Sequence, residues 1–545
     1  MATQNPNPDE ATAVLDSAHV GDIRGAFGTI GQHDVGARSS MKARLLTLLA
    51  IMGPGLIVMI GDNDAGGVST YAQAGQNFGL SLLWTLPLLI PVLVVNQEMV
   101  VRLGAVTGVG HARLINERFG RFWGAFSVGD LFILNFLTIA TEFIGVSLSL
   151  GYFGVSRYVS VPIAALALIL MTATGSFRRW ERFMFVFIFA NFLVIPLAIM
   201  RHPSVGPIVH GFVTPGVRGG FNSTSVLLIM AIVGTTVAPW QLFFQQSNIV
   251  DKRITPRWIN YERTDTVVGS FITVFAAAIL IVVVATAFGS TPLAGHFQNG
   301  AAVADGLRHY VGRAAGVIFA VILLNASIIG AASVTLATSY AFGDMFGARH
   351  SLHRSWRDAK FFYGVFTAMV VLAAGIVIIP GAPLGLITTS VQALAGVLLP
   401  SATVFLLLLC NDREVLGPWV NRLWLNIVAS VIVGVLLMMS LVLMITTLFT
   451  TINVKDLALI LAAIFVVTFL TAGVILALRR RGAAPEPVEF RGNRATWRMP
   501  PINLLHRPRW SKGTLAGMYV LRGYLVVAVA MLLVKAIQLG LVHHR

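Results

Sequence analysis

Long uninterrupted apolar runs recur along this chain, and they constrain its fold more than any other feature. Two of them, at 271–289 and 456–478, are each long enough to cross a bilayer as a helix. Hydrophobic residues make up 56% of the chain and charged residues 11%, whereas an average soluble domain carries about 25% charged residues. The chain is therefore predicted to be an all-α polytopic membrane protein, because continuous runs argue against the alternating pattern of a β-barrel.

Twelve apolar segments are predicted to span the membrane, and a thirteenth either spans it or lies at its surface. They lie at 45–61 with 66–78, 81–103, 125–150, 157–175, 183–200, 224–247, 267–289, 314–342, 361–380, 385–409, 423–448, 456–478 and 515–539. Lys and Arg concentrate in the short loops between alternate segments. This distribution explains the net charge of +16, so no nucleic-acid partner is needed to account for it. It also predicts that the N-terminus is cytoplasmic and that the protein lies in the plasma or inner membrane.

The regions outside the apolar segments divide the chain further. We expect a disordered cytoplasmic tail over 1–40, a transporter core over 41–450, an additional transmembrane helix over 451–478, a basic cytoplasmic linker over 479–514 and a C-terminal membrane-spanning or interfacial helix over 515–545. The single cysteine, Cys410, excludes an intramolecular disulfide and a cysteine-based zinc site. We also expect His111, His350 and His353, which fall in basic loops, to be surface residues.

Two of the spans are interrupted, and the interruptions are five helices apart. The first span breaks at GDNDAGG (61–67), and the sixth breaks at TTVAPWQ (235–241), where Pro239 removes a backbone donor. Matched breaks of this kind predict two inverted five-helix repeats, about 41–200 and 223–410, followed by an eleventh helix. Discontinuous helices in corresponding positions form the binding site of many secondary transporters near the bilayer midplane.

The polar residues at these breaks are the candidate cation ligands. A carboxylate inside a membrane is costly and is a functional hypothesis by default, so Asp64 is the principal candidate. Carbonyls freed by the breaks, at Gly61 and Thr235, would add oxygen ligands. The remaining candidates are polar groups that lie at the breaks or deep in apolar spans: Asp62, Gln241 and Gln392 as direct or water-mediated ligands, and Glu142, Asn63 and Thr236 along the ion path.

Three features are specific enough to compare with known families: GPGLIVMIGDNDAGGVSTYAQAGQNFGLSLLW in the first span, TEFIG in the third and Gln392 in the tenth. Over residues 45–450 the chain resembles the NRAMP family of divalent metal transporters, whose first helix, third-helix motif and tenth-helix glutamine are similar to these three features. The resemblance implies the five-plus-five inverted-repeat (LeuT-like) fold with helices 1 and 6 unwound. It also implies a bound divalent ion as cargo, without a cofactor or an enzymatic activity.

The sequence departs from the family pattern at the ligands. The family's Asp-Pro-Gly-Asn reads Asp64-Ala65-Gly66-Gly67 here, and its Met-Pro-His reads Ala238-Pro239-Trp240. Without a thioether the site is all oxygen, which suits hard ions such as Mg²⁺. We expect Gly67 and Ala238 to widen the site for a partly hydrated ion. Ile139 and Trp240 replace two titratable groups of the family's proton route, as in the NRAMP-related magnesium transporter branch.

The sequence therefore predicts a monomeric transport unit that moves Mg²⁺, and Mn²⁺ as a further ion, by alternating access without proton coupling. One alternative is a proton-coupled Mn²⁺/Fe²⁺ symporter, as in the main family. A second is an amino-acid or organic-cation symporter of the same fold, although Asp64 would repel a substrate carboxylate. A non-transporting scaffold is disfavoured, because it would not need two matched helix breaks.

Overall fold

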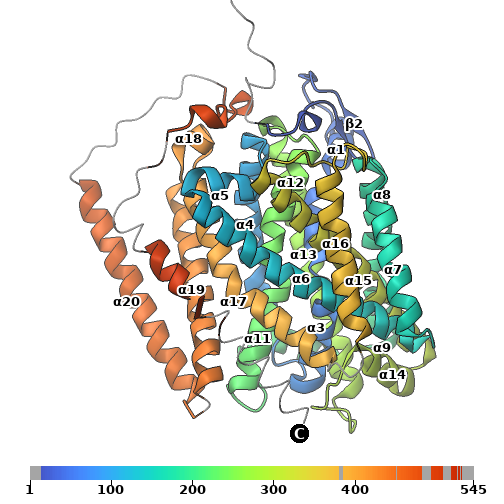
Figure 1. The fold of residues 1–545 in the computed structure, drawn as a ribbon. Coiled ribbons are helices and arrows are strands. Elements are labelled where there is room, and N and C mark those ends of the chain that lie inside the picture. The colour runs from blue at the N-terminus through green and yellow to red at the C-terminus, as the bar shows by residue number, and fades with distance from the viewer. Residues whose placement is uncertain are drawn as a thin grey trace, which may run out of the picture.

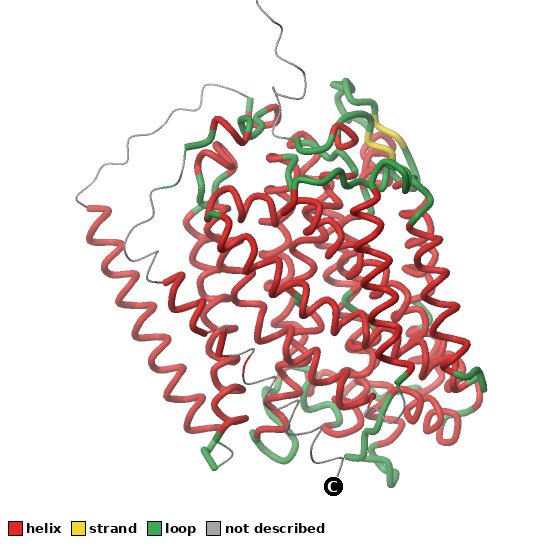
Figure 2. Tube along the Cα trace, viewed as in Figure 1, coloured by secondary structure: helices red, strands yellow, loops and turns green. Residues whose placement is uncertain are grey.

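The computed structural model describes residues 14–379, 384–449, 451–481, 493–506 and 517–524, with the single positions 508, 526, 527 and 530. Helices dominate it, and one short hairpin of strands β1 (Ile23–Arg24) and β2 (Thr29–Ile30) lies at one end (Figure 2). Within the described residues, ten helices are long and apolar enough to span a membrane, or eleven if a bent pair counts as one. The predicted all-α polytopic fold is thereby confirmed.

The helices of the first half begin with a span in three pieces. They are α1 (Met41–Ile51), α2 (Pro54–Gly61), α3 (Ala65–Phe78), α4 (Thr85–Thr107), α5 (His111–Phe119), α6 (Arg121–Tyr152), α7 (Arg157–Thr172), α8 (Phe177–Asn191), α9 (Val194–Arg201) and α10 (Val205–Val213). Between α1 and α2 the chain bends by 54° at Gly53, whose φ of 152° favours glycine. Pro54 then begins α2 with a φ that suits the first helical position.

The helices of the second half begin with the second broken span. They are α11 (Ser223–Thr236), α12 (Pro239–Asp251), α13 (Ile259–Phe288), α14 (Gly300–Tyr310), α15 (Arg313–Phe346), α16 (Lys360–Ile378), α17 (Leu384–Cys410), α18 (Arg413–Leu416), α19 (Leu423–Leu448) and α20 (Val454–Arg481). Each of the twelve predicted apolar segments coincides with one or more helices. The thirteenth, 515–539, lies largely outside the described residues, although 517–524 are helical.

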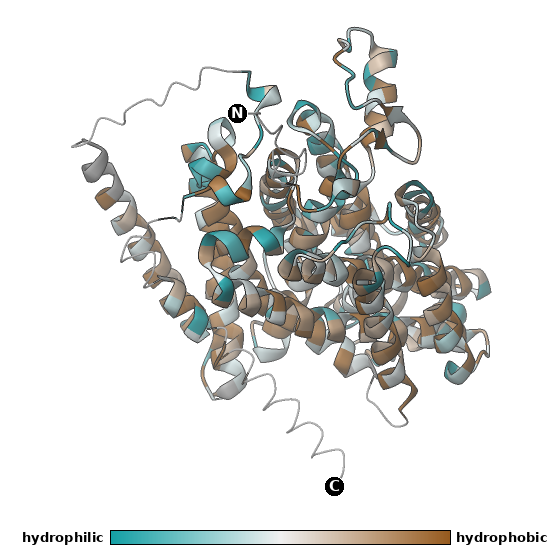
Figure 3. Cartoon of the chain, turned by 45° about the horizontal axis from the view of Figure 1, so that its top comes forward, coloured by the Kyte–Doolittle hydropathy of each residue, from teal (hydrophilic) through white to brown (hydrophobic). Residues whose placement is uncertain are grey.

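The core pairs helices from the two halves of the chain. α6 packs along α15, α11 along α17, and α13 along both α2 and α3 (Figure 1). By contrast, α20 stands at the edge of the bundle beside α19, and its apolar side chains are exposed, with Leu459 at 60% and Leu470 at 62%. Hydrophilic residues gather in the loops at the ends of the helices (Figure 3), as expected of a bundle whose flanks face lipid.

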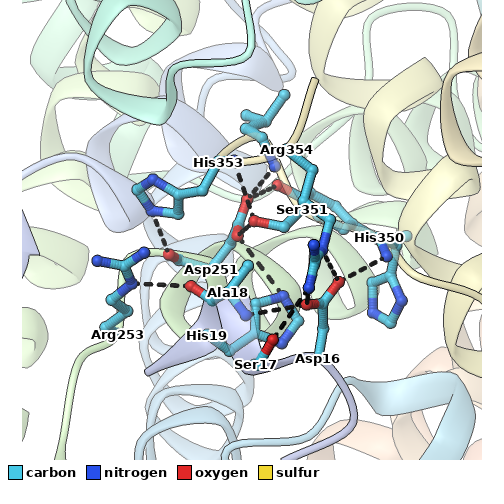
Figure 4. Close-up of polar contacts among 12 residues, drawn as sticks. Asp16, Ser17, Ala18, His19, Asp251, Arg253, His350, Ser351, His353 and Arg354 are labelled. Carbon is cyan, nitrogen blue, oxygen red and sulfur yellow. Dashed lines mark hydrogen bonds and ion pairs between the residues drawn. The ribbon is translucent and has the colours of Figure 1, made fainter. Parts of the chain in front are cut away.

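The N-terminal segment packs onto one end of the bundle, so the predicted disordered tail over 1–40 is wrong for residues 14–40. Asp16 accepts hydrogen bonds from Arg354 Nε and Nη2 at 2.9 and 2.5 Å, and His19 lies 3.5 Å from Asp251 (Figure 4). Arg253 Nε donates to the Ala18 carbonyl at 2.9 Å. Residues 1–13 lie outside the described residues.

Part of the predicted basic linker, 479–514, also packs against the bundle. The Met499 N–H donates to the Val106 carbonyl at 3.1 Å, and Arg118 donates to the His506 carbonyl at 2.7 Å. Trp419 reaches the Arg494 carbonyl from its indole nitrogen at 2.9 Å. Residues 493–506 therefore lie against the same end of the bundle as the N-terminal segment (Figure 1).

Two of the three loop histidines are buried, which corrects the expectation that they lie on the surface. His111 pairs with Gln246 at 2.8 Å, and burial lowers its pKa to about 4. Burial also acts to lower the pKa of His350, but the Asp344 carboxylate 3.0 Å away outweighs it, and the pKa is raised. Only His353 is half-buried, where burial lowers its pKa. The rings of His111 and His350 therefore pack inside one end of the bundle and not on its surface.

Candidate cation site at the two helix breaks

The first break lies between α2 and α3, where Asp62, Asn63 and Asp64 are not helical. Asp64 is the N-cap of α3, with extended backbone (ψ −179°), and its Oδ1 accepts the Gly67 N–H at 2.6 Å. A carboxylate at this position also faces the positive end of the helix dipole. The sequence thus places the main acid at a point where the backbone itself stabilises a negative charge.

The second break lies between α11 and α12, at Val237 and Ala238. Pro239 occupies the first position of α12, where its missing N–H costs no helical hydrogen bond. The Ala238 N–H donates to Gln241 Oε1 at 3.1 Å, so Gln241 caps its own helix. The predicted unwinding of helices 1 and 6 is confirmed at both places.

The breaks free particular carbonyls. In a continuous helix each carbonyl would accept the N–H of the residue four positions later. The partner of Gly61 would be the Ala65 N–H, which donates instead to Glu142 Oε2 at 3.1 Å. The partner of Thr235 would be residue 239, a proline without an N–H. Both carbonyls predicted as ligands are therefore released from helical hydrogen bonding.

Side chains from three other helices converge on Asp64 at the start of α3. Thr235 Oγ1 of α11 donates to Asp64 Oδ1 at 3.5 Å, which joins the two breaks directly. Glu142 of α6 and Gln392 of α17 lie close to the Asp64 carboxylate, although Gln392 Nε2 has no hydrogen-bond partner among the described residues. All four side chains are at most 2% exposed. The structure thus brings together four of the side chains singled out in the sequence, from α3, α6, α11 and α17.

Glycines bring these elements into contact. A Cβ on Gly66 would lie 1.7 Å from Gln392 Nε2. A Cβ on Gly67 would lie 2.8 Å from the Asp62 carbonyl oxygen, 2.9 Å from Thr235 Oγ1 and 3.4 Å from Asp64 Oδ1. The expectation that Gly67 widens the site is therefore wrong. It allows three oxygen atoms to gather over its α-carbon.

Other predicted residues lie elsewhere or are engaged by other groups. Asn63 turns to α13 and donates to the Thr273 carbonyl at 3.2 Å, and Thr236 Oγ1 donates to Ile232 at 2.7 Å. Gln241 Oε1 serves Ala238, as described, and also accepts from Gln97 at 3.3 Å. Neither oxygen of Asp62 has a hydrogen-bond partner among the described residues, although both are buried. Asp62 is thus an unsatisfied acid beside the break, available to an ion or water.

The sequence did not single out Gly330, which α15 places against the site. A Cβ there would lie 2.6 Å from both Cδ and Oε2 of Glu142 and 2.8 Å from Cβ of Asp64. The run of small residues in SIIGAAS (327–333) is a signal for close helix packing in membranes and could have indicated it.

The donor set is hard and consists of oxygen. Carboxylate, hydroxyl, amide and freed main-chain oxygens surround the break, and Ala238 supplies no sulfur. The part of the chain that the structure describes contains no group of three or more His, Cys, Asp or Glu side chains placed to hold a metal. An ion at this site would therefore depend on main-chain and amide oxygens as well as on acids, which suits Mg²⁺, Ca²⁺ or Mn²⁺.

Comparisons with known proteins agree with this geometry. Residues 55–446 match the family model described as "Natural resistance-associated macrophage protein-like". The chain is 28% identical over 410 residues to a "Divalent metal cation transporter MntH" of Xanthomonas campestris, covering 71% of this chain and 89% of that one. A protein of the same name from Staphylococcus aureus is 25% identical, with coverage of 75% and 93%. A crystal structure of the Eremococcus coleocola manganese transporter shares the fold, with a TM-score of 0.60 at 20% identity, covering 82% and 98%.

Proposed function

This chain belongs to the Nramp family of divalent metal transporters, and we propose that within it the chain carries Mn²⁺ across the membrane by alternating access. The observation that carries the proposal is the contact between the two helix breaks, Thr235 to Asp64. A cation bound there touches both repeats at once. Its arrival and departure can therefore bias how the repeats sit against each other.

In the proposed site Asp64 supplies the principal negative charge. The carbonyls of Gly61 and Thr235 and the side chain of Gln392 supply neutral oxygens, and Asp62 holds the ion directly or through water. Carboxylate, carbonyl and water ligands suit Mn²⁺, and the relatives named for divalent metal transport support this cargo.

Mg²⁺ remains a second candidate because of one observation, Ala238. The absent thioether removes the ligand that would favour a softer metal, and an all-oxygen site also satisfies Mg²⁺. The two ions differ in what they require, since Mg²⁺ demands near-octahedral geometry and loses its water reluctantly. A competition series between them at equal concentrations ranks the two candidates.

We also propose that transport is coupled to protons, as in the Mn²⁺/Fe²⁺ symporter alternative, and that Glu142 is the acid that carries the proton. Glu142 and Asp64 are two buried carboxyl groups in contact, and two such groups are stable together only with a proton or a cation between them. Because metal binding requires deprotonated ligands, binding releases protons. Entry of Mn²⁺ should then acidify the vesicle lumen.

The test is Mn²⁺ flux into proteoliposomes that contain the full chain. We expect Asp64→Ala to abolish flux, while Asp305→Ala, which removes a surface acid exposed at 57%, leaves it unchanged. Flux of an amino acid or choline in place of a metal would contradict the proposal. So would undiminished Mn²⁺ flux in Asp64→Ala. A lumenal pH dye, recorded in the same vesicles, decides the proton coupling separately.

We further propose that the transporter resides in the plasma membrane with its N-terminal segment in the cytoplasm, and that one chain is the transport unit. The Lys- and Arg-rich loops at the end of the bundle that carries this segment support the orientation.

A further inference from the structure

A polar stripe runs along α12 away from the site. Gln241, Gln245 and Asn248 are spaced by four and three residues, so they lie on one face of the helix. All three are fully buried, and each has at least one polar atom without a hydrogen-bond partner among the described residues. Apolar residues would fill this face at lower cost, because burying an unsatisfied polar group is unfavourable. We therefore expect the stripe to have a function other than packing.

Helices α4 and α13 close over the stripe. Gln97 of α4 donates to Gln241 at 3.3 Å, and Asn96 beside it has neither side-chain atom bonded within the described chain. Gln245 Nε2 donates to Thr266 Oγ1 of α13 at 2.8 Å. The stripe starts at the Ala238 break and leads toward the end of the bundle that carries the N-terminal segment. It advances by about 1.5 Å per residue, the rise of an α-helix.

At Gln245 the stripe meets two acids of α13, Glu262 and Asp265. Glu262 is fully buried, and neither of its carboxylate oxygens is bonded in the part of the chain that the structure describes. Thr266 follows Glu262 by four residues, so the Gln245 amide, which binds Thr266, lies over the Glu262 face of α13. Gln245 Oε1 has no described partner either. Three unsatisfied oxygens thus gather at one place.

Asp265 links this place to the first broken span. Its Oδ2 accepts the N–H groups of Gly53, Gly55 and Leu56 at 3.0, 2.8 and 3.2 Å, which caps the start of α2. Its Oδ1 has no partner among the described residues. One oxygen therefore holds α2, and the other is available beside Glu262.

The nearby positive charge is already engaged. Lys252 Nζ lies 2.6 Å from Glu181 and also donates to the carbonyls of Ile51 and Met52 at 2.7 and 2.8 Å. The charge of Lys252 also acts on Glu262 and Asp265, so among the described residues here one ammonium serves three buried acids. Buried carboxylates in excess of their counter-charge are costly, and carboxylate and amide oxygens are the ligands that hard divalent cations take.

We propose that Glu262, Asp265 and Gln245 form a second site for the transported divalent cation, which the ion occupies after it leaves Asp64. The inference rests on the proposed function. The collapsed stripe of α12 is then the closed route between the two sites. Because Asp265 also holds the start of α2, an ion that arrives there acts on the same helix whose other end carries the first site.

The test counts bound Mn²⁺ by electron paramagnetic resonance on the full-length protein in detergent, over a titration that saturates the parent. We expect Asp64→Ala to retain about one Mn²⁺ per chain, and Asp64→Ala combined with Glu262→Gln to lose it. The matched control is Asp64→Ala with Asp305→Asn, which should keep the ion. If Glu262→Gln prevents folding, Gln245→Leu in the same background should weaken the remaining site at least tenfold.

Each outcome decides one of the two proposals. If Asp64→Ala binds no Mn²⁺ while the parent does, the second site is wrong and the proposed function stands. This result is also the one expected if Glu262 carries a proton rather than a metal. If the double variant still binds the ion, the assignment to Glu262 is wrong. If the parent neither binds nor carries a divalent metal, the proposed function fails first.

Discussion

Adding one methyl group at Gly330 is the sharpest perturbation of the proposed site, because it changes no ligand. Gly330→Ala places a Cβ 2.6 Å from Cδ and Oε2 of Glu142 and 2.8 Å from Cβ of Asp64, closer than carbon atoms in proteins approach. Glu142 must then rotate away from the Ala65 N–H, or α15 must move away from α3 and α6. Either change disturbs the first break, where Ala65 and Asp64 adjoin.

The expected loss of metal affinity in Gly330→Ala follows from the free-energy costs of these two changes. Overpacking of a well-packed interior costs about 1–3 kcal/mol, and a hydrogen bond to a charged group contributes about 1.5–3 kcal/mol. The costs are alternatives, since the helix either yields or loses the bond. A loss of about 1–3 kcal/mol corresponds to roughly a 5- to 150-fold weaker apparent affinity for the metal.

The assay compares Mn²⁺ uptake and thermal unfolding of Gly330→Ala with those of Gly129→Ala. Gly129 is also a glycine inside a membrane helix, α6, but a Cβ there meets no atom within 4 Å. We expect Gly129→Ala to match the parent in transport and to be at least as stable, because alanine is the better helix former. Parent-like KM and unfolding temperature in Gly330→Ala would refute the close packing of α15 on Glu142.

Two further predictions concern the end of the bundle that carries the N-terminal segment. Lys252→Met should lower the free energy of unfolding by about 3–5 kcal/mol, because it leaves Glu181 buried without its partner; a second change, Glu181→Leu, should restore most of it in thermal unfolding. Burial, with a smaller part from His350, lowers the pKa of His19 to about 4 against the attraction of Asp251, Asp16 and Asp344. The unfolded chain therefore takes up this proton first, and the stability of the docked segment, full above pH 6.5, should fall by roughly 3 kcal/mol as the pH drops to 4. Hydrogen exchange of residues 14–31 measures it, and His19→Gln should remove this pH dependence.

The fold could be predicted from the sequence because its signals are local. Hydrophobic runs fix the spans, and Pro239 and the glycines after Asp64 mark the breaks by the hydrogen bonds they remove. The repeats follow from the spacing of the breaks alone. None of these inferences requires knowledge of which helices touch.

Contacts between distant segments could not be predicted in this way. Asp16 meets Arg354 across 338 positions of sequence, and nothing near Asp16 indicates that partner. A polar, partly acidic segment was therefore expected to be disordered. The burial of His350 has the same origin, because its partner Asp344 and the N-terminal segment together cover it.

Gln241 is a different case, since its role was visible in local sequence. It lies three residues after Ala238, at the position from which a glutamine side chain returns to cap its own helix, and Pro239 marks the helix start. The position of Gln241 at the break predicts a cation ligand instead. In the structure its Oε1 accepts the Ala238 N–H, so the amide holds the shape of the break and leaves only Nε2 without a described partner.

Two of the departures from the family pattern, Gly67 and Ala238, act on the site in different ways. Gly67 is a steric requirement, because three oxygens lie where its side chain would be, and any larger residue, the family's asparagine included, would displace them. Ala238 changes the chemistry of the site, because it removes a ligand. It leaves the path of the backbone unchanged, since Pro239 and Gln241 already fix that path. A substitution at residue 67 should therefore change whether an ion binds, and one at residue 238 which ion binds. Selectivity between Mn²⁺ and Mg²⁺ then depends on how closely the remaining oxygens approach an octahedron, since both ions accept the same donor atoms.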